Sequence, residues 1–132
     1  MMKTLSIKTH AQFELLDITS QVQQTLKESG IKEGILHIFI PHTTAGVTIN
    51  EGADPSVKKD IIKELNKVIP LHDNYAHMEG NSAAHIKSTL VGASEIVMIE
   101  NGTLVLGTWQ KIFFCEFDGP RHRKAYVSIQ GR

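Results

Sequence analysis

The sequence predicts a single α+β domain, a sandwich in which helices pack on a largely antiparallel sheet. Three observations support this prediction. Apolar residues recur at helical spacing after Pro55, Asn101-Gly102 separates two apolar runs in the manner of a β-hairpin, and the last forty residues are predicted to be strands. The length of 132 residues suits one domain, and no linker, repeat or low-complexity tract divides residues 1–132.

Capping residues set the bounds of the predicted helices. Thr19 is positioned to cap the first helix and Gly30 to end it. Asp54 followed by Pro55 is a typical start for the second, and Asn81 is positioned to cap the third. In chain order we expect two strands within 3–18, a helix at 19–29, strands at 33–40 and 47–50, helices at 55–69 and 82–91, and strands at 95–100, 103–108, 109–118 and 121–130.

Three segments between these bounds have their own signals. The apolar run at 33–40 suits a central strand, and Pro41 ends it. In the helix at 55–69 one face is apolar, which predicts that this face is part of the core. The stretch 71–80 has no periodicity and is predicted to be a functional loop. Gly119-Pro120 is predicted to be a turn between the last two strands.

Composition excludes several classes of protein. Fourteen basic and fourteen acidic residues cancel, so nothing favours nucleic-acid binding through phosphate neutralisation. No apolar run is long enough for a membrane span, and the first ten residues are too polar for a secretory signal. Cys115 is the single cysteine, which excludes an internal disulfide and fits a reducing compartment. We therefore expect a cytoplasmic protein.

Two arginines and two carboxylates are predicted to converge at the Gly119-Pro120 turn. Alternation along the last strand places Arg121 and Arg123 on its apolar side, and alternation along the preceding strand does the same for Glu116 and Asp118. A charge on an apolar face is costly unless it is paired or bound. The group is therefore either a structural ion-pair cluster or a site for anions or acid/base chemistry, and strand parity does not separate the two.

Three histidines are candidates for a shared site. His85 lies one turn into the helix that Asn81 begins, where the free backbone N–H groups attract anions. His77 lies eight residues earlier, and His42 follows the central strand. Three imidazoles with an open position would resemble a catalytic zinc site, but the spacing is not diagnostic and by itself favours hydrogen-bonded structural histidines. The remaining histidines are expected to be structural: His10, His37, His72 and His122.

Several segments together resemble the YjbQ family over essentially the whole chain. In sequence order they are Pro41-His42-Thr43-Thr44-Ala45-Gly46, Asn74-Tyr75-Ala76-His77, Asn81-Ser82-Ala83-Ala84-His85-Ile86-Lys87, Leu106-Gly107-Thr108-Trp109-Gln110 and Asp118-Gly119-Pro120-Arg121. The resemblance implies a compact α+β sandwich that assembles as a homotrimer, with a polar cleft that binds metal ions or anions.

The resemblance also implies roles for individual residues. His42, His77 and His85 become metal ligands. The other implied roles are acid/base work for Glu116 and Asp118, and anion or substrate binding for Thr43, Thr44, Asn81, Lys87, Gln110, Arg121 and Arg123. Glu51 is a further candidate for proton transfer if the protein is a metal-dependent hydrolase.

Three functions follow as hypotheses. The first is the transfer for which the family is labelled, a thiamine-phosphate synthase-like joining of an aminopyrimidine pyrophosphate to a thiazole phosphate with release of pyrophosphate. The second is a metal-dependent hydrolase, and the third is a non-catalytic binder of a small phosphorylated metabolite. The implied divalent metal is zinc or magnesium: three histidines suit zinc, whereas pyrophosphate departure usually calls for magnesium held by carboxylates.

Overall fold

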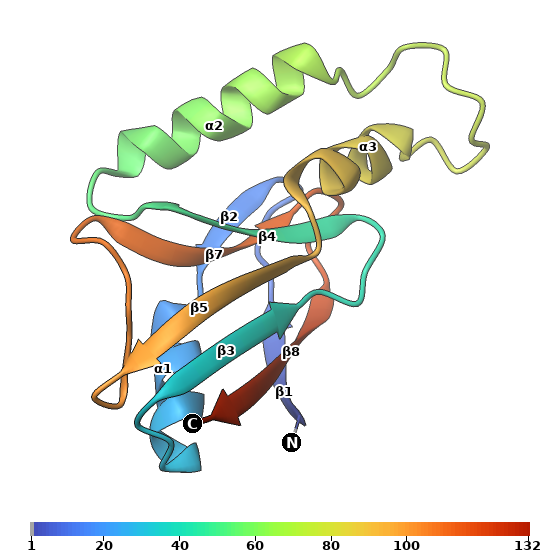
Figure 1. Cartoon of the computed structure of the whole chain (residues 1–132). Helices are drawn as coiled ribbons and strands as arrows, with labels where there is room; N and C mark the ends of the chain where they lie inside the picture. The colour runs from blue at the N-terminus through green and yellow to red at the C-terminus, as the bar shows by residue number, and fades with distance from the viewer. Residues whose placement is uncertain (1) are drawn as a thin grey trace.

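The computed structural model describes residues 2–132, which form three helices and eight strands (Figure 1). The elements in chain order are β1 (Met2–Lys8), β2 (Glu14–Asp17), α1 (Thr19–Ser29), β3 (Gly34–Phe39), β4 (Ala45–Glu51), α2 (Pro55–Val68), α3 (Ser82–Val91), β5 (Ser94–Glu100), β6 (Thr103–Leu104), β7 (Gln110–Glu116) and β8 (His122–Gly131). The predicted element order is confirmed. The strand predicted at 103–108 is much shorter: β6 ends at Leu104, and beyond it one bond from Val105 N–H to the carbonyl of Met98 still joins the chain to β5.

The strands form two antiparallel sheets. One has five strands in the order β1-β8-β3-β5-β6, and the other has three in the order β2-β7-β4. The α+β antiparallel fold expected from the sequence is confirmed. The strands on either side of the Gly119-Pro120 turn are not partners: β7 pairs with β2 and β4, whereas β8 pairs with β1 and β3. This turn therefore carries the chain from one sheet to the other.

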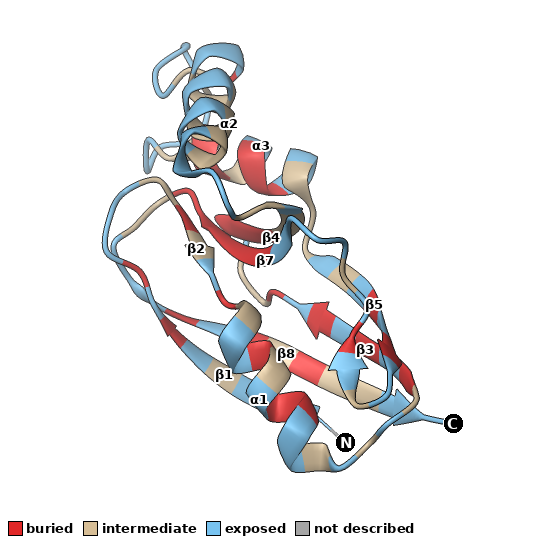
Figure 2. Ribbon diagram, turned by 90° about the vertical axis from the view of Figure 1, so that its left-hand side faces the viewer, coloured by how far each residue is buried: buried red, intermediate tan, exposed pale blue. Residues whose placement is uncertain are grey.

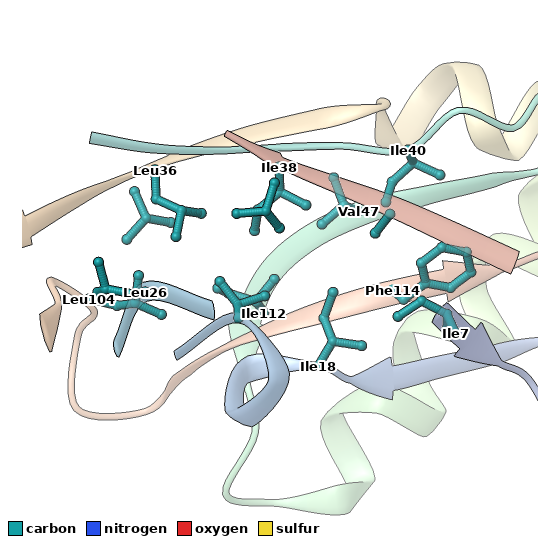
Figure 3. Close-up of a cluster of buried hydrophobic side chains, with 14 of the residues drawn as sticks. Ile7, Ile18, Leu26, Leu36, Ile38, Ile40, Val47, Leu104, Ile112 and Phe114 are labelled. Carbon is teal, nitrogen blue, oxygen red and sulfur yellow. The ribbon is translucent and has the colours of Figure 1, made fainter. Parts of the chain in front are cut away.

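The main core lies between the two sheets (Figure 3). Leu36 and Ile38 of the central strand β3 point inward toward Ile112 and Phe114 of β7, and α1 adds Leu26. Every second residue of β3 is buried and every other one is exposed, as expected for a strand with one face in the core. Burial of this apolar surface is the main source of stability in a domain of this size.

A second, smaller core covers the outer face of the three-stranded sheet, beneath α2 and α3 (Figure 2). Phe113 and Cys115 of β7 pack there against Ala84 of α3. The predicted core face of the helix at 55–69 is only half-buried, and no residue between Pro55 and Val68 is fully buried. The reason is geometric: the sheet is narrow and α3 already covers part of it, so α2 contacts it along one edge.

Side-chain hydrogen bonds decide the predicted caps of α1 and α2, with different results. The Asp54 cap is confirmed, because its Oδ1 accepts the backbone N–H of Ser56 at 2.9 Å. The Thr19 cap is wrong: the helix begins after Ile18, and Thr19 Oγ1 instead accepts the N–H of Ile112 at 2.8 Å. Thr19 thereby ties α1 to β7, so a tertiary partner replaces the local one.

No helix within residues 2–132 is long and apolar enough to cross a membrane.

Candidate functional site

Polar side chains gather where β7 ends and α3 begins. Asp118 is the centre of the group. Its Oδ2 accepts a hydrogen bond from Nδ2 of Asn81 at 3.0 Å and another from Nη2 of Arg121 at 2.8 Å. Arg121 Nε also donates to the carbonyl of Asp118 at 2.7 Å. Asn81 does precede α3 as expected, but the predicted capping bond is wrong, because its side chain turns to Asp118 instead. The carboxylate therefore fixes both partners.

A cavity of about 340 Å³ lies beside this group, within the size range of small-molecule sites. The Arg121 side chain is 51% exposed there, and its Nη1 makes no hydrogen bond within residues 2–132. The cavity also contains two titratable residues that sequence reasoning did not select, Glu79 and His72. His72 was expected to be structural, and the only signal for either residue was the aperiodic stretch 71–80. Its lining is Gln12, Leu71, His72, Glu79, Gly80, Asn81, Ala84, Phe117, Asp118 and Arg121.

The second arginine and carboxylate form a buried ion pair. Arg123 donates from Nε to Glu116 Oε1 at 2.9 Å and from Nη2 to the other carboxylate oxygen. Thr9 Oγ1 donates to Glu116 at 2.7 Å, and Arg123 Nη2 donates to Thr44 Oγ1 at 2.9 Å. The predicted convergence of arginines and carboxylates is confirmed, and this inner pair has the geometry of a structural ion pair, because Glu116 is completely buried.

The environment of Glu116 keeps it ionised. Burial by itself would raise the pKa of this carboxyl group. Hydrogen bonds from Arg123, Thr9 and the backbone of Asp118 outweigh burial and hold the pKa below its usual range. Both oxygens are therefore occupied and neither faces the solvent, which leaves the acid/base role predicted for Glu116 without an accessible atom.

His42 is fixed by the backbone of β8. Its Nε2 lies 2.9 Å from the backbone N of Lys124, which donates its hydrogen to the ring. The pairing of β3 with β8 stops at Phe39 opposite Tyr126, and the His42 side chain takes up a backbone donor beyond that point. Partial burial, and then the nearby charge of Arg123, lower the pKa of His42.

The other two candidate histidines lie together. The rings of His77 and His85 are edge to face, with centroids 5.4 Å apart. His85 also lines a second hollow on the surface, of about 430 Å³, with Thr43, Ser88 and Thr89. The predicted proximity of His77, from the loop, and His85, from the start of the helix, is thus observed.

Tight contacts between α3 and β4 hold this second hollow in place. Ser88 Oγ donates to the carbonyl of Ala45 at 2.6 Å, and Val47 N–H donates to the carbonyl of Gly92 at 3.1 Å. A Cβ atom on Gly46 would lie 2.6 Å from that same Gly92 oxygen, closer than carbon and oxygen pack. The glycine of the Thr-Thr-Ala-Gly segment is therefore needed for this approach.

The three histidines do not fit a shared metal ion in this arrangement. A neutral imidazole has one lone pair to give to a metal, and that of His42 accepts the Lys124 N–H. In residues 2–132 no group of three or more His, Cys, Asp or Glu side chains is arranged to hold a metal ion. The donor set implied by the resemblance thus lacks its third ligand.

Three other residues selected from the sequence do not reach this group: two lie at the far end of β7, and the third is buried. Glu51 and Gln110 are partners at the opposite end of the β4–β7 pair, six strand residues or roughly 20 Å from Glu116. Lys87 is buried, with Nζ hydrogen-bonded to Asn66 and 4.2 Å from the centre of the Phe13 ring. The expectation that they share the cleft is not met within one subunit, because residue type and local parity do not encode this placement.

Comparison with known proteins places the chain among close relatives. Residues 3–132 match the model of the family described as "UPF0047 protein YjbQ-like". YugU of Bacillus subtilis is 56% identical over 132 residues, which cover 99% of this chain and all of that protein. A UPF0047 protein of Methanocaldococcus jannaschii is 58% identical over 125 residues, covering 95% of this chain and 91% of that protein.

Solved structures are similar over the full length. A YjbQ/UPF0047 protein of Clostridium acetobutylicum superposes with a TM-score of 0.95 at 52% identity, covering 97% of this chain and 99% of that one. A YbjQ-like protein of Sulfolobus solfataricus superposes with a TM-score of 0.95 at 38% identity, covering all of this chain and 97% of that one. The two-sheet fold with its outer helices is thus shared with these relatives.

Proposed function

The chain belongs to the YjbQ-like UPF0047 family, and from this premise we propose that it is an enzyme that acts on small phosphorylated metabolites in the cavity beside Arg121. The reaction we propose is a thiamine-phosphate synthase-like transfer. A slow rate of this transfer would indicate that it is secondary to another reaction of the same site. The supporting observation is the guanidinium of Arg121, half-exposed in a cavity of about 340 Å³ and held by Asp118.

The proposed reaction requires little covalent help from the protein. The ring nitrogen of a thiazole phosphate attacks the methylene carbon of an aminopyrimidine pyrophosphate. The new C–N bond forms as the C–O bond breaks, and the pyrophosphate leaves with the bonding electrons. Positive charge at the departing oxygens is the main requirement. Arg121 and the N-terminal end of α3 would supply it, since both border the cavity.

The two alternative functions have less support. A metal-dependent hydrolase built on three histidines loses its third ligand, because His42 Nε2 accepts the Lys124 N–H. A non-catalytic binder would use the same cavity and the same arginine, and differs from the enzyme only in the absence of turnover. We therefore place the transferase first and leave the binder as the outcome that an assay would reveal.

We also propose that the protein assembles as a homotrimer through the outer face of the five-stranded sheet. This face carries exposed apolar side chains on adjacent strands: Ile96 is 63% and Met98 is 69% exposed on β5. Phe39 of β3 stacks on Tyr126 of β8 on the same face, with ring centroids 6.4 Å apart. Contiguous apolar surface of this kind is typical of an interaction site.

The cytoplasm is the compartment we propose. Cys115 is the single cysteine, and it is buried in the smaller core. Burial, with the nearby charge of Glu95, raises the pKa of its thiol to about 12, so the thiolate does not form near neutral pH. The cysteine therefore acts as a small apolar side chain, which requires no oxidising environment.

The experiment combines a binding measurement with an activity assay. Pyrophosphate binding is measured by calorimetry for the wild type, Arg121→Ala and the control Arg132→Ala, which removes an exposed arginine paired with Glu33 at 3.8 Å. Loss of a charged hydrogen-bond donor should weaken binding by about 10- to 100-fold in Arg121→Ala alone. Thiamine phosphate formation is then followed in the same variants. Equal binding in all three proteins would remove the basis of the proposal, and binding without product would leave the non-catalytic binder.

A further inference from the structure

We propose that His42 binds an anionic ligand as a neutral hydrogen-bond donor, through the N–H at Nδ1, and that it does not coordinate a metal. The tautomer follows from the geometry of the ring alone. The ligand class, an oxygen of a phosphate group, rests on the proposed function.

The tautomer is fixed by the contact with β8. A backbone N–H has no lone pair, so the 2.9 Å bond between Lys124 N and Nε2 requires that Nε2 accepts. Nε2 therefore carries the lone pair, and in the neutral ring the proton resides on Nδ1. A ring held in this way has no free lone pair for a metal ion and no free base nitrogen for proton abstraction.

The surroundings favour the neutral ring. A proton on Nε2 would face the N–H of Lys124, and the ring is also near the guanidinium of Arg123. Glu116 opposes this effect, but its carboxylate is engaged by Arg123 itself. Burial and the Arg123 charge are the two largest influences, and both lower the pKa of His42.

The Nδ1 side of the ring is open. His42 is half-buried, and within residues 2–132 the one buried side-chain nitrogen or oxygen without a partner is Asn81 Oδ1. Nδ1 makes no hydrogen bond in this part of the chain, so it reaches the surface rather than being enclosed. The next residue, Thr43, lines the hollow that also contains His85. An N–H and a hydroxyl group from adjacent residues are suited to the oxygens of a phosphate.

Two isosteric substitutions separate the two sides of the ring. In His42→Gln the amide oxygen lies where Nε2 was and keeps the bond to Lys124, but no donor remains at the Nδ1 position. In His42→Asn the amide nitrogen lies where Nδ1 was, and the bond to Lys124 is lost. We expect His42→Gln to fold with stability near the wild type and to bind inorganic phosphate about 10-fold or more weakly. His42→Asn should be less stable but retain most of the phosphate affinity.

The direct test is ¹⁵N NMR of protein labelled at histidine, with the His42 signals identified by their loss in His42→Gln or, should that variant not fold, in His42→Asn. The expected spectrum at neutral pH has a protonated Nδ1 and an unprotonated Nε2. Phosphate should shift the Nδ1 signal, and zinc should shift signals of other histidines without moving those of His42. A proton on Nε2, a zinc-dependent shift of His42, or no response to phosphate would each overturn the proposal. Failure of pyrophosphate binding at Arg121 would refute the proposed function and leave the tautomer intact, so the two outcomes are distinguishable.

Discussion

Nε of Arg123 lies 2.9 Å from Oε1 of Glu116 at a point where three separate parts of the chain meet. Thr9 follows β1, Thr44 precedes β4, and Asp118 follows β7, and each donates to or accepts from this pair. Glu116 is completely buried and Arg123 is 5% exposed. The ion pair thus positions the segment that carries His42 and the turn that carries Arg121, which is how an interior contact shapes the candidate site.

Removal of one partner of this pair should destabilise the protein strongly. We expect Glu116→Ala to lower the free energy of unfolding by about 3–5 kcal/mol, because the guanidinium of Arg123 would remain buried without a counter-charge. Urea denaturation followed by circular dichroism measures the change. In the control Arg132→Ala, which breaks an exposed pair, the change should be about 0–1 kcal/mol.

A double substitution tests the cause of that loss. Glu116→Met combined with Arg123→Met removes both charges and keeps much of the volume, so it should cost less than Glu116→Ala alone. A double variant that is less stable than the single variant would show that hydrogen bonds to Thr9 and Thr44, rather than the unpaired charge, dominate.

Local rules predicted much of this region from the sequence. Strand alternation predicted that Arg121, Arg123, Glu116 and Asp118 lie together, because all four belong to one eight-residue span that contains the turn. It did not predict that Arg123 pairs with Glu116 while Arg121 pairs with Asp118. It also could not predict that the turn links two sheets, since sheet membership depends on distant partners such as β1 and β4.

Long-range partners explain the other differences. His77 and His85 are eight residues apart, and their proximity followed from the helix start between them. The partner of His42 is a backbone group 82 residues away, which leaves no signal in residue type. The anion-binding role of Lys87 was implied by the resemblance to the YjbQ family, but Phe13 and Asn66 enclose its side chain.

Lys87 is therefore expected to have no part in anion binding. Lys87→Met keeps the length of the side chain and removes a charge whose burial lowers its pKa. We expect pyrophosphate binding to stay within about 2-fold of the wild type, a difference of about 0.4 kcal/mol. Calorimetry under the conditions used for Arg121→Ala makes the comparison. A loss as large as that of Arg121→Ala would mean that Lys87 leaves its buried position to reach the ligand.

The outer face of the five-stranded sheet should control assembly. Ile96→Asp places a charge on this face without touching either core, since the side chain is 63% exposed. The fold should persist while the mass measured by light scattering falls from that of a trimer to that of a monomer. The matched control is Leu90→Asp on α3, where an equally exposed apolar residue lies outside this face. A trimer that withstands Ile96→Asp but not Leu90→Asp would place the interface on the helices.

Acidification should destabilise the protein in two stages with different origins. The pKa of His42 is lowered from 6.5, so just below pH 6.5 the unfolded chain binds a proton at this residue that the folded protein does not. Stability should therefore fall as the pH drops through 6.5 to the folded-state pKa, and then stop changing on this account. The pKa of Glu116 is lowered from 4.5, which should produce a further loss as the pH falls below 4.5.

Substitution separates the two stages. Urea denaturation from pH 7.5 to about pH 3 should show that His42→Gln loses the first stage and keeps the second, because the glutamine retains the bond to Lys124 without titrating. His122→Gln, on the surface of β8, is the matched control and should follow the wild type. If the first stage persists unchanged in His42→Gln, the ring of His42 is not the group that resists protonation, and the contact between Nε2 and β8 does not hold in solution.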